Sequence, residues 1–365
     1  MRADLPPAVA STIDRCERPS LVFDIATIEA NVRAIAGAAR EAGVTALFAA
    51  KSFPHPEVRA IAARWLDGFD AASSAEIAEL PRVGTLSIAD PTGRAISCAG
   101  TWPHRVIVSC DTVEQVRAAP ARAAIAIRLS ASLTGRDPAI GAVLDGTGHR
   151  RSRFGLDVAV ARRSELIAAM AREADKRAIG IHVHHGPITA GSAERFIATA
   201  RAAIDGAAAA GVSPAFLNLG GAWHAIGDVR AALGAIRAAV PRGIELLIEP
   251  GRSISDAAGF ACGRVAIARE LDDRPLRVVD LSRICHLRWS QIELVASAPH
   301  AGTGQRGLFV GPTCFEDDAL GDWMIAPNGF GAGSRVVVRN VSGYALAWNT
   351  GFGGLAPADV VLATG

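Results

Sequence analysis

Short apolar runs alternate along the first two thirds of the chain with alanine-rich segments of helical periodicity. The runs are rich in apolar residues and bounded by polar or glycine positions, which predicts eight buried strands at 45–50, 68–73, 86–90, 106–111, 124–130, 179–185, 216–221 and 245–250. Helical spacing of apolar residues predicts helices at 26–41, 54–66, 74–81, 112–119, 157–175, 190–211 and 226–239. This alternation is typical of βα units around a parallel sheet.

The number of strands indicates how the sheet is arranged. Eight strands with helical crossovers match a (β/α)8 (TIM) barrel in about the usual length, opened here by the helix at 26–41. An open, doubly wound sheet is the alternative that the pattern leaves standing.

The sequence pattern changes after residue 252. The remaining stretches are short, strand-like and separated by Gly, Pro and Asp turns, with no long helical period. We therefore predict two domains: a barrel over residues 25–252, and a mostly β domain over residues 253–365 that includes residues 1–24.

The amino-acid composition limits which binding partners and which cellular compartment we expect. The formal net charge is +2, which predicts no nucleic-acid partner, and no apolar run reaches the roughly 20 residues that a membrane span needs. The N-terminal sequence lacks the apolar stretch of a signal peptide. Six scattered cysteines without a CxxC pair favour reduced thiols in a cytoplasmic protein and no metal site.

Lysine is scarce in this chain. Of 38 basic residues, only Lys51 and Lys176 are lysines. Lys51 follows an apolar run, TALFAAK, and a lysine amine can form a Schiff base where arginine cannot readily do so. Lys176 lies in a polar stretch at the end of a helical segment, where a solvated surface role is expected, and chance survival of two lysines is the alternative for both.

Chemically useful residues cluster at the predicted strand ends, where barrel enzymes place their active sites. They supply an amine, carboxylates, an arginine, histidines and a glycine turn: Lys51, Asp70, Ser73, Glu76, Arg128, His182, His184, His185, Gly220, Gly221, Glu249, Gly251 and Arg252. Each has a structural interpretation as well, because buried histidines are often core residues and strand-end carboxylates often cap helices. Together they suit a phosphorylated aldehyde cofactor, with backbone N–H groups and Arg252 on the phosphate.

Seven segments, in chain order, resemble those of one enzyme family. FAAKSF carries the family's Schiff-base lysine at Lys51, and GFDAASSAEI matches its FD-ASxxEI stretch through Asp70 and Ser73. RSRFGL is similar to its SKFG segment. GIHVHHG is similar to HxHxG, which puts His184 where the family stacks a histidine on the cofactor.

The later segments complete the resemblance. LNLGGAW looks like the family's glycine loop, and EPGR, from Glu249 to Arg252, looks like its strand-eight motif. GPTCFEDD places Cys314 and Asp318 on a Cys-x-x-x-Asp pattern, and SGYALAW places Tyr344 where a tyrosine contacts the phosphate. The family is the fold-type III pyridoxal-5′-phosphate (PLP) decarboxylases, which act on ornithine, arginine, diaminopimelate and carboxynorspermidine and share an alanine racemase-like barrel.

The resemblance implies a PLP enzyme that decarboxylates an amino acid with a charged, amino- or carboxyl-bearing side chain through a Lys51 Schiff base and a quinonoid. The implied catalytic residues are Lys51, His184, Glu249 and Cys314. The implied cofactor-binding residues are Lys51, Asp70, Ser73, Arg128, His184, Gly220, Gly221, Glu249, Gly251, Arg252 and Tyr344. Substrate contacts are expected from Cys314, from Arg288 with a distal carboxylate and from Asp318 with a distal ammonium. A homodimer with shared sites is also implied, the Cys–Asp segment of one subunit completing the site of the other.

Several positions depart from the family pattern. Arg153 replaces a lysine, Asn218 an aspartate, Ala222 a third glycine and Gly353 an asparagine. Pro187 stands where a phosphate-binding serine is usual. None of these changes removes a catalytic group, but they argue against a standard diaminopimelate or ornithine enzyme.

Two alternatives remain. An amino-acid racemase shares the fold, but alanine-type racemases pair the pyridine nitrogen with arginine, whereas this chain offers Glu249 and Cys314. A non-catalytic PLP carrier or regulator is the second. The loop at 131–150 has no assignment, and whether Cys314 or Lys51 returns a proton to the α-carbon is left open.

Overall fold

The computed structural model describes residues 5–130, 154–156, 160–184, 193–224, 227–295, 304–326 and 328–365. The chain separates into two compact units. One comprises Val32–Lys51 and His55–Ser253, and the other comprises Met1–Asn31, Ser52–Pro54 and Ile254–Gly365. The long helix α2 (Ile25–Ala42) therefore contributes to both units, whereas the sequence assigned all of it to the barrel.

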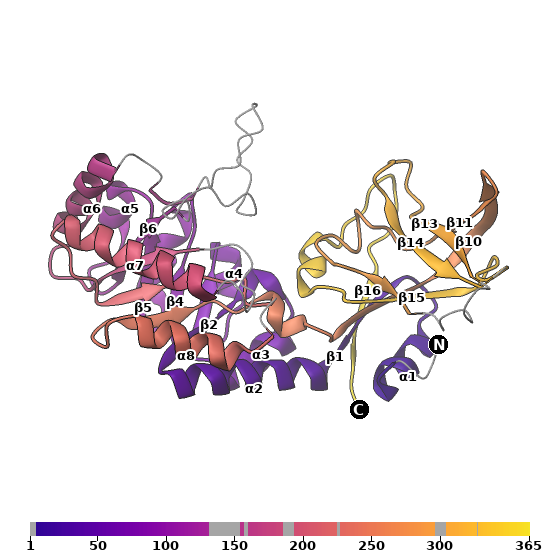
Figure 1. The fold of residues 1–365 in the computed structure, drawn as a ribbon, viewed down its shortest axis with the longest axis horizontal. Helices are drawn as coiled ribbons and strands as arrows, with labels where there is room; N and C mark the ends of the chain where they lie inside the picture. The colour runs from indigo at the N-terminus through magenta and orange to yellow at the C-terminus, as the bar shows by residue number, and fades with distance from the viewer. Residues whose placement is uncertain are drawn as a thin grey trace. The chain divides into compact units, whose positions relative to one another are not determined.

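The first unit is a closed barrel of eight parallel strands, which confirms the predicted (β/α)8 architecture and excludes the open sheet (Figure 1). Its strands are β2 (Val44–Ala49), β3 (Gly68–Ala71), β4 (Thr85–Ile88), β5 (Val106–Cys110), β6 (Ala124–Leu129), β7 (Ile179–Val183), β8 (Phe216–Asn218) and β9 (Glu245–Ile248). Pairing of β2 with β9 closes the ring.

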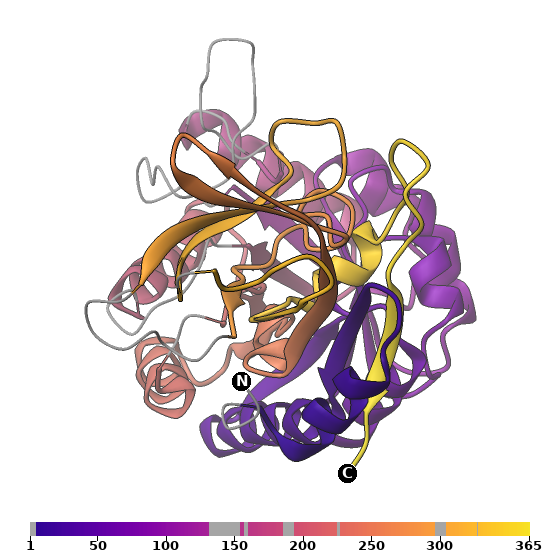
Figure 2. The ribbon, with the colours of Figure 1, turned by 90° about the vertical axis from the view of Figure 1, so that its right-hand side faces the viewer.

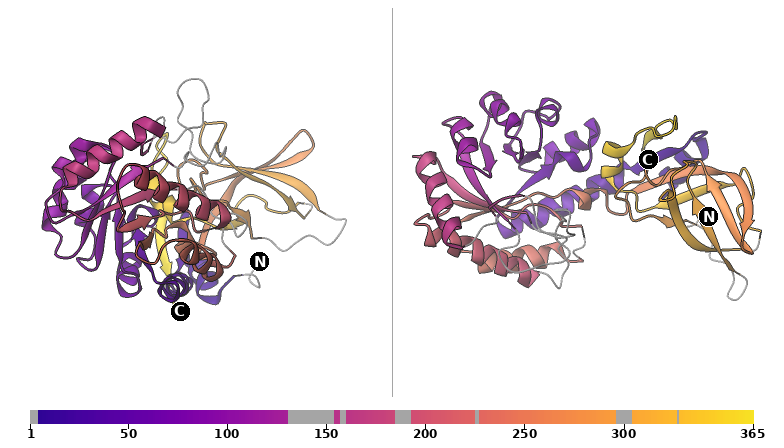
Figure 3. Two further views of the ribbon diagram at one scale, coloured as in Figure 1. Left: turned by 60° about the vertical axis from the view of Figure 1, so that its left-hand side comes forward. Right: turned by 90° about the horizontal axis from the view of Figure 1, so that it is seen from above.

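Helices follow most of the barrel strands and lie along their outside, as the right-hand view of Figure 3 shows. They are α3 (Pro56–Trp65), α4 (Ser74–Ala78), α5 (Val113–Ala118), α6 (Val160–Ala174), α7 (Ala193–Ala209) and α8 (Val229–Ala239). Side-chain caps fix where several begin: Thr112 forms a capping box with Gln115 on α5, and Asp228 accepts from the Ala231 N–H on α8. A 3₁₀ helix, η3 (Arg94–Thr101), connects β4 and β5 where the sequence predicted no helix.

Apolar side chains from facing strands fill the barrel core. One cluster joins Leu47, Ile107, Ala124, Ala126, Phe216 and Leu247. The ring of Phe216 occupies space that only a glycine leaves open, because a Cβ at Gly180 would lie 2.3 Å from its ring carbons. Close packing of this kind fixes the strands that carry the polar residues at their ends.

The strands end one to three residues earlier than the sequence predicted. Lys51 consequently lies in the short 3₁₀ turn η2 (Ala50–Ser52) rather than at the end of a strand. Gly220 and Gly221 follow β8, and Glu249 follows β9. The apolar pattern continues past the last strand hydrogen bonds because these turns are themselves largely buried.

The second unit is mostly β (Figure 2). Its elements are α1 (Pro7–Arg15), β1 (Ser20–Asp24), η6 (Arg252–Ser255, shared with the barrel), β10 (Gly259–Leu271), β11 (Arg274–Val279), β12 (Glu293–Leu294), β13 (Gln305–Val310), β14 (Ala319–Ile325), β15 (Arg335–Arg339), η7 (Gly343–Trp348) and β16 (Asp359–Ala363). Strand β1 pairs antiparallel with β10 and parallel with β16, so the N-terminal segment belongs to this sheet. Helix α1, which the sequence pattern did not predict, packs Val9 and Ile13 into its core.

Some sequence-based interpretations lie outside the described residues: His185, Arg153, Pro187 and the loop at 131–150. Within the described ranges, none of the helices combines the length and apolar character that a membrane span requires.

Candidate functional site

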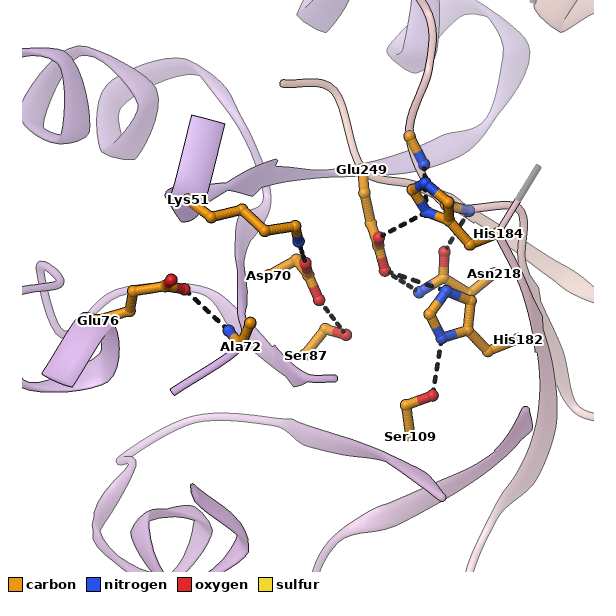
Figure 4. A network of polar contacts seen from close by, with 12 residues as sticks. Lys51, Asp70, Ala72, Glu76, Ser87, Ser109, His182, His184, Asn218 and Glu249 are labelled. Carbon is orange, nitrogen blue, oxygen red and sulfur yellow. Dashed lines mark hydrogen bonds and ion pairs between the residues drawn. The ribbon is translucent and has the colours of Figure 1, made fainter. Parts of the chain in front are cut away.

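Lys51 is held by a buried carboxylate at the C-terminal end of the barrel. Its Nζ lies 2.7 Å from Oδ2 of Asp70, which comes from β3 and is fully buried. The hydroxyl of Ser87 on β4 donates to the other oxygen, Oδ1, at 3.1 Å (Figure 4). A buried carboxylate needs such partners to offset its lost hydration. The Lys51 side chain stays 35 % exposed, so its amine is fixed in place yet accessible.

Glu249 lies on the neighbouring side of the same barrel end and is buried. Its Oε1 accepts a hydrogen bond from Nδ2 of Asn218 at 2.7 Å. Burial raises the pKa of Glu249 to about 8, and the negative charge of Asp70 acts in the same direction. Lys51, the Asn218 hydrogen bond and Arg128 act in the opposite direction on that pKa.

Two histidines of the HVH segment face Glu249 in different ways. His182 is fully buried, and burial, followed by Arg128, holds the pKa of its imidazole well below the ordinary 6.5. Its Nδ1 lies 2.7 Å from the Ser109 hydroxyl, and its Nε2 lies 3.6 Å from Oε1 of Glu249. His184 is 42 % exposed, with Nδ1 at 3.9 Å from Oε2 of Glu249. One imidazole is therefore a neutral core group, and the other presents its ring to solvent.

The glycine turn after β8 is shaped by its contact with His184. Gly220 has φ +66°, and a Cβ there would lie 2.6 Å from Nδ1 of His184. The Gly221 N–H donates to that same Nδ1 at 3.3 Å. Ala222, at the position of the family's third glycine, adopts φ +73°, a left-handed conformation that is unfavourable for a residue with a Cβ. The first glycine is thus required both by conformation and by space.

Ser73 and Glu76 cap the helix that follows β3. The Ser73 hydroxyl accepts from the Glu76 N–H at 3.2 Å, and the Glu76 carboxylate accepts from the Ala72 N–H at 2.8 Å. The structural interpretation of these residues therefore holds, and a cofactor contact by Ser73 stays a prediction.

The two predicted arginines of the barrel differ in surroundings. Arg128 on β6 is buried, with its guanidinium 4.7 Å from the ring centre of Phe154. Arg252 follows β9 and Gly251 and begins η6, where it is partly exposed. Arg128 is buried and Arg252 is partly exposed, so Arg252 is the more accessible of the two for a phosphate.

The other predicted site residues belong to the β-rich unit. Cys314 is an exposed free thiol. Arg288 is exposed, with its guanidinium 4.6 Å from the ring centre of Trp348, and the ring of Tyr344 lies 5.3 Å from that of Trp289. Arg288 and Tyr344 thus share one aromatic cluster, since Trp289 also contacts Trp348.

Asp318 has surroundings that its predicted substrate contact does not suit. It is 2 % exposed, and Oδ1 accepts from the Ser282 hydroxyl and the N–H groups of Arg283 and Ile284. Its Oδ2 accepts from the N–H and hydroxyl of Thr313. With both oxygens occupied, Asp318 is better suited to anchoring these loops than to binding a substrate ammonium.

Sequence reasoning missed two polar partners, Ser87 and Ser109. Each is the one serine of a mostly apolar strand, TLSI of β4 and VIVSC of β5, and each bonds a charged or polar site residue. A lone serine in a buried strand was the available signal, because a buried hydroxyl needs a hydrogen-bond partner.

The donor set fits the predicted PLP. An accessible amine suits the aldehyde, Glu249 suits a ring nitrogen, and the exposed imidazole of His184 suits a flat ring. The donor atoms of His182, His184 and Glu249 also lie within 4.8 Å of one another, as metal ligands can. However, the positive charges of Lys51 and Arg128 act on the same groups, and they disfavour a cation there.

Comparison with known proteins identifies the family of this chain. Residues 25–256 match the family model described as the pyridoxal binding domain of pyridoxal-dependent decarboxylases. The chain is 26 % identical to diaminopimelate decarboxylase of Pseudomonas aeruginosa, over 98 % of this chain and 90 % of that protein.

Solved structures show the same fold over nearly the whole chain. Lysine/ornithine decarboxylase of Vibrio vulnificus, complexed with cadaverine, matches with a TM-score of 0.78 at 18 % identity, covering 98 % of both chains. Arginine decarboxylase of Paramecium bursaria Chlorella virus, bound to agmatine, matches with a TM-score of 0.78 at 17 % identity, covering 97 % of this chain and 99 % of that one. These matches support the barrel with an added β domain as one shared architecture.

Proposed function

We infer that this chain, which belongs to the family of pyridoxal-dependent decarboxylases, acts on an amino acid whose side chain carries a carboxylate. The chain is a PLP-dependent amino-acid decarboxylase, as its family and its relatives are. The proposed refinement of the substrate depends on Arg288, an exposed guanidinium that the Trp348 ring orients.

Arg288 is suited to a carboxylate ligand. Among the described residues, no Asp or Glu forms an ion pair with it. A planar guanidinium stacked on an indole keeps its N–H edge available for a bidentate carboxylate contact. The predicted contact for a substrate ammonium, Asp318, is buried and fully bonded. We therefore favour the carboxyl-bearing branch of the predicted substrates over the amino-bearing one.

In the proposed site, Lys51 supplies the amine that binds the cofactor, and Asp70 keeps that amine in position. When bound, PLP supplies an aldehyde for Lys51 and a ring that accepts the electron pair released at the α-carbon. Glu249 holds a proton at the ring nitrogen, and His184 packs on the ring face. Further cofactor contacts are proposed for Ser73, Arg128, Gly220, Gly221, Gly251, Arg252 and Tyr344.

Cys314 and a homodimer complete the proposal. The thiol is exposed in the single chain, so it is accessible to a substrate carbon. Phe315, Phe352 and Trp289 of the same unit expose 50, 45 and 50 % of their surfaces, which supports a surface that another subunit covers. The proposed assembly is a two-fold homodimer, and a cytoplasmic location stays a prediction.

The test is mass spectrometry of products formed in deuterium oxide by PLP-loaded protein from acidic, basic and neutral amino acids of both configurations. An amine that has lost CO2 and carries deuterium at the α-carbon, formed from a carboxyl-bearing substrate, is the expected result. Decarboxylation of diamino acids alone would contradict the substrate proposal. Intact amino acid labelled at the α-carbon would instead indicate a racemase.

Arg288→Gln tests the tail contact separately. We expect a KM raised about tenfold or more for the carboxyl-bearing substrate with little change in PLP affinity, since a charge-assisted pair contributes about 1.5–3 kcal/mol. Arg264→Gln, at an exposed arginine on β10, is the matched control. An unchanged KM for Arg288→Gln would remove the basis of the carboxylate assignment.

A further inference from the structure

Two cysteines that are far apart in the sequence meet in the β-rich unit. Cys16 is the C-terminal cap residue of helix α1, and Cys262 lies on strand β10. Cys262 belongs to the apolar cluster that contains Val9 and Ile13 of α1, and Cys16 packs against that same cluster. A side-chain hydrogen bond with Cys16 is one of the interactions that act on the Cys262 thiol. The two sulfur atoms are therefore neighbours within one unit.

Strand pairing explains why the two thiols meet. Cys262 is opposite Ser20 of β1 on one side and opposite Val337 of β15 on the other. Residues directly opposite one another in an antiparallel pair point to the same face of the sheet. Residues 17–19 form the short connection from Cys16 to Ser20, so the chain after α1 returns to the face on which the Cys262 side chain lies.

Arg335 fastens this end of α1 to the sheet. Its Nη1 donates to the carbonyl oxygen of Ile13 at 2.7 Å and to that of Cys16 at 3.1 Å. The charge of the same guanidinium, and its hydrogen bond, act to lower the pKa of the Cys262 thiol. A cation beside a cysteine favours the thiolate, which is the form that attacks another sulfur. The arginine thus holds Cys16 in place and assists Cys262.

The two thiols differ in their access to solvent. Cys262 is fully buried, and burial raises its pKa to about 12, with Cys16 acting in the same direction. Cys262 therefore stays a protonated thiol that solvent oxidants do not reach. Cys16 is partly exposed and lines a surface hollow of about 410 Å³ together with Arg15 and Asp359. An oxidant consequently meets Cys16 first, with Cys262 beside it as a second thiol.

We propose that Cys16 and Cys262 are a redox-sensitive pair, which a peroxide converts into a disulfide that fastens α1 to β10. The Cys16 sulfur attacks one oxygen of hydrogen peroxide, the O–O bond breaks, and the leaving hydroxide takes the thiol proton to become water. The Cys262 sulfur then attacks the sulfenic sulfur of Cys16, the S–O bond breaks, and the hydroxide leaves as a second water with the Cys262 proton. The two thiols together lose two electrons, which hydrogen peroxide gains.

The disulfide closes a loop that includes most of the chain. A cross-link over so long a segment restricts the unfolded chain and raises the stability of the folded one. Its reduction by a thiol is slow for two reasons. The Cys262 sulfur is buried, and attack on Cys16 must expel the Cys262 thiolate, a poor leaving group because of its high pKa.

The experiment treats PLP-loaded protein with hydrogen peroxide, alkylates the remaining thiols in denaturant and identifies linked tryptic peptides by mass spectrometry. We expect peptides joined through Cys16 and Cys262, and a urea midpoint that rises on oxidation by on the order of 1 M. Cys262→Ala keeps a small apolar side chain in the cluster. In this variant the link and the rise in midpoint should be absent, and dimedone should trap a sulfenic acid at Cys16.

Two further variants make the result specific. Cys16→Ser should also lack the link and the rise in midpoint, and it provides the test if Cys262→Ala does not fold. Cys98→Ser, at a thiol of intermediate exposure in the barrel unit, is the matched control and should retain both. The proposal would be overturned if native Cys16 were oxidised without a link to Cys262 or were linked to another cysteine. It would also be overturned if Cys16 stayed a thiol at peroxide doses that oxidise Cys98.

Discussion

Nζ of Lys51 and Oδ2 of Asp70 lie 2.7 Å apart. The Lys51 side chain is 35 % exposed, whereas that of Asp70 is fully buried. The carboxylate is fully buried and bonded to Ser87, so it cannot follow the amine if the lysine moves. The Lys51 amine, by contrast, is accessible, because 35 % of its side chain is exposed. The buried anion therefore gives the accessible amine one position to which it pairs.

Lys51→Ala is expected to abolish turnover and the covalent linkage that borohydride traps between the protein and PLP. The chain offers a matched control, because Lys176 is its other lysine. Lys176→Ala should retain both activity and the trapped adduct, and peptide mass spectrometry should place the adduct at residue 51. An adduct that persists in Lys51→Ala would refute the assignment of the cofactor lysine.

Gly220→Ala is expected to weaken PLP binding and destabilise the protein. The positive φ costs about 1–2 kcal/mol for a residue with a Cβ, and the new Cβ would lie 2.6 Å from the His184 ring, which must then shift. Urea unfolding and PLP titration measure the two effects. Gly234→Ala is the control, since a Cβ there meets no atom within 4 Å, and in helix α8 it should stabilise by about 0.5–1 kcal/mol.

Features that depend on a short stretch of sequence could be predicted, whereas contacts between residues far apart in the sequence could not. The barrel strands could be predicted because each is a continuous apolar run, and Lys51, Asp70, His184 and Glu249 meet because parallel strands of a barrel end together. The surroundings of Asp318 could not be predicted. The partners of its Oδ1 lie at 282–284, more than thirty residues earlier, and only the folded loops bring them to it.

The hydrogen-bond partners inside the site could not be predicted from the sequence either. Ser87 and Ser109 look like ordinary strand residues until the barrel places them beside Asp70 and His182. Asn218 was visible only as a departure from the family pattern, and its bond to Glu249 gave that departure a physical meaning. Sequence therefore located the reacting groups better than the residues that position them.

Ala222→Gly is expected to stabilise the protein by up to about 1.5 kcal/mol. Ala222 has φ +73°, and relief of that conformation gains about 1–2 kcal/mol, less about 0.5–1 kcal/mol for the greater chain entropy of glycine when unfolded. Urea unfolding at one pH gives the difference directly. Ala232→Gly, at a buried position of helix α8, should destabilise instead. A loss of stability in Ala222→Gly would show that the alanine side chain contributes packing that outweighs the strain.

Cys314→Ala is expected to leave PLP affinity unchanged and to impair protonation of the product carbon. The thiol is exposed and is proposed to act on substrate rather than on cofactor. The measurement is the ratio of amine product to side products, together with deuterium incorporation at the α-carbon. Cys98→Ala, at a thiol of intermediate exposure, is the control. Normal rate and normal product ratio in Cys314→Ala would assign the proton transfer to Lys51.

Glu249→Gln is expected to change how the stability of the apoprotein depends on pH. The pKa of Glu249 is raised from the ordinary 4.5 to about 8, so between these values the folded chain holds a proton that the unfolded chain has released. Stability therefore falls as pH rises through this window, because a buried carboxyl must ionise. His182 acts oppositely, since its lowered pKa makes the unfolded chain bind the extra proton below about pH 6.5.

The difference between native and Glu249→Gln proteins isolates the Glu249 contribution, because His182 is present in both. Unfolding by urea at a series of pH values should show the native apoprotein losing stability relative to the variant as pH rises from about 4.5 to about 8. With PLP bound, the variant should keep the cofactor but decarboxylate much more slowly, since an amide does not hold a proton at the ring nitrogen as a carboxylate does. A pH-independent difference would mean that Glu249 is already ionised throughout this range in the folded apoprotein.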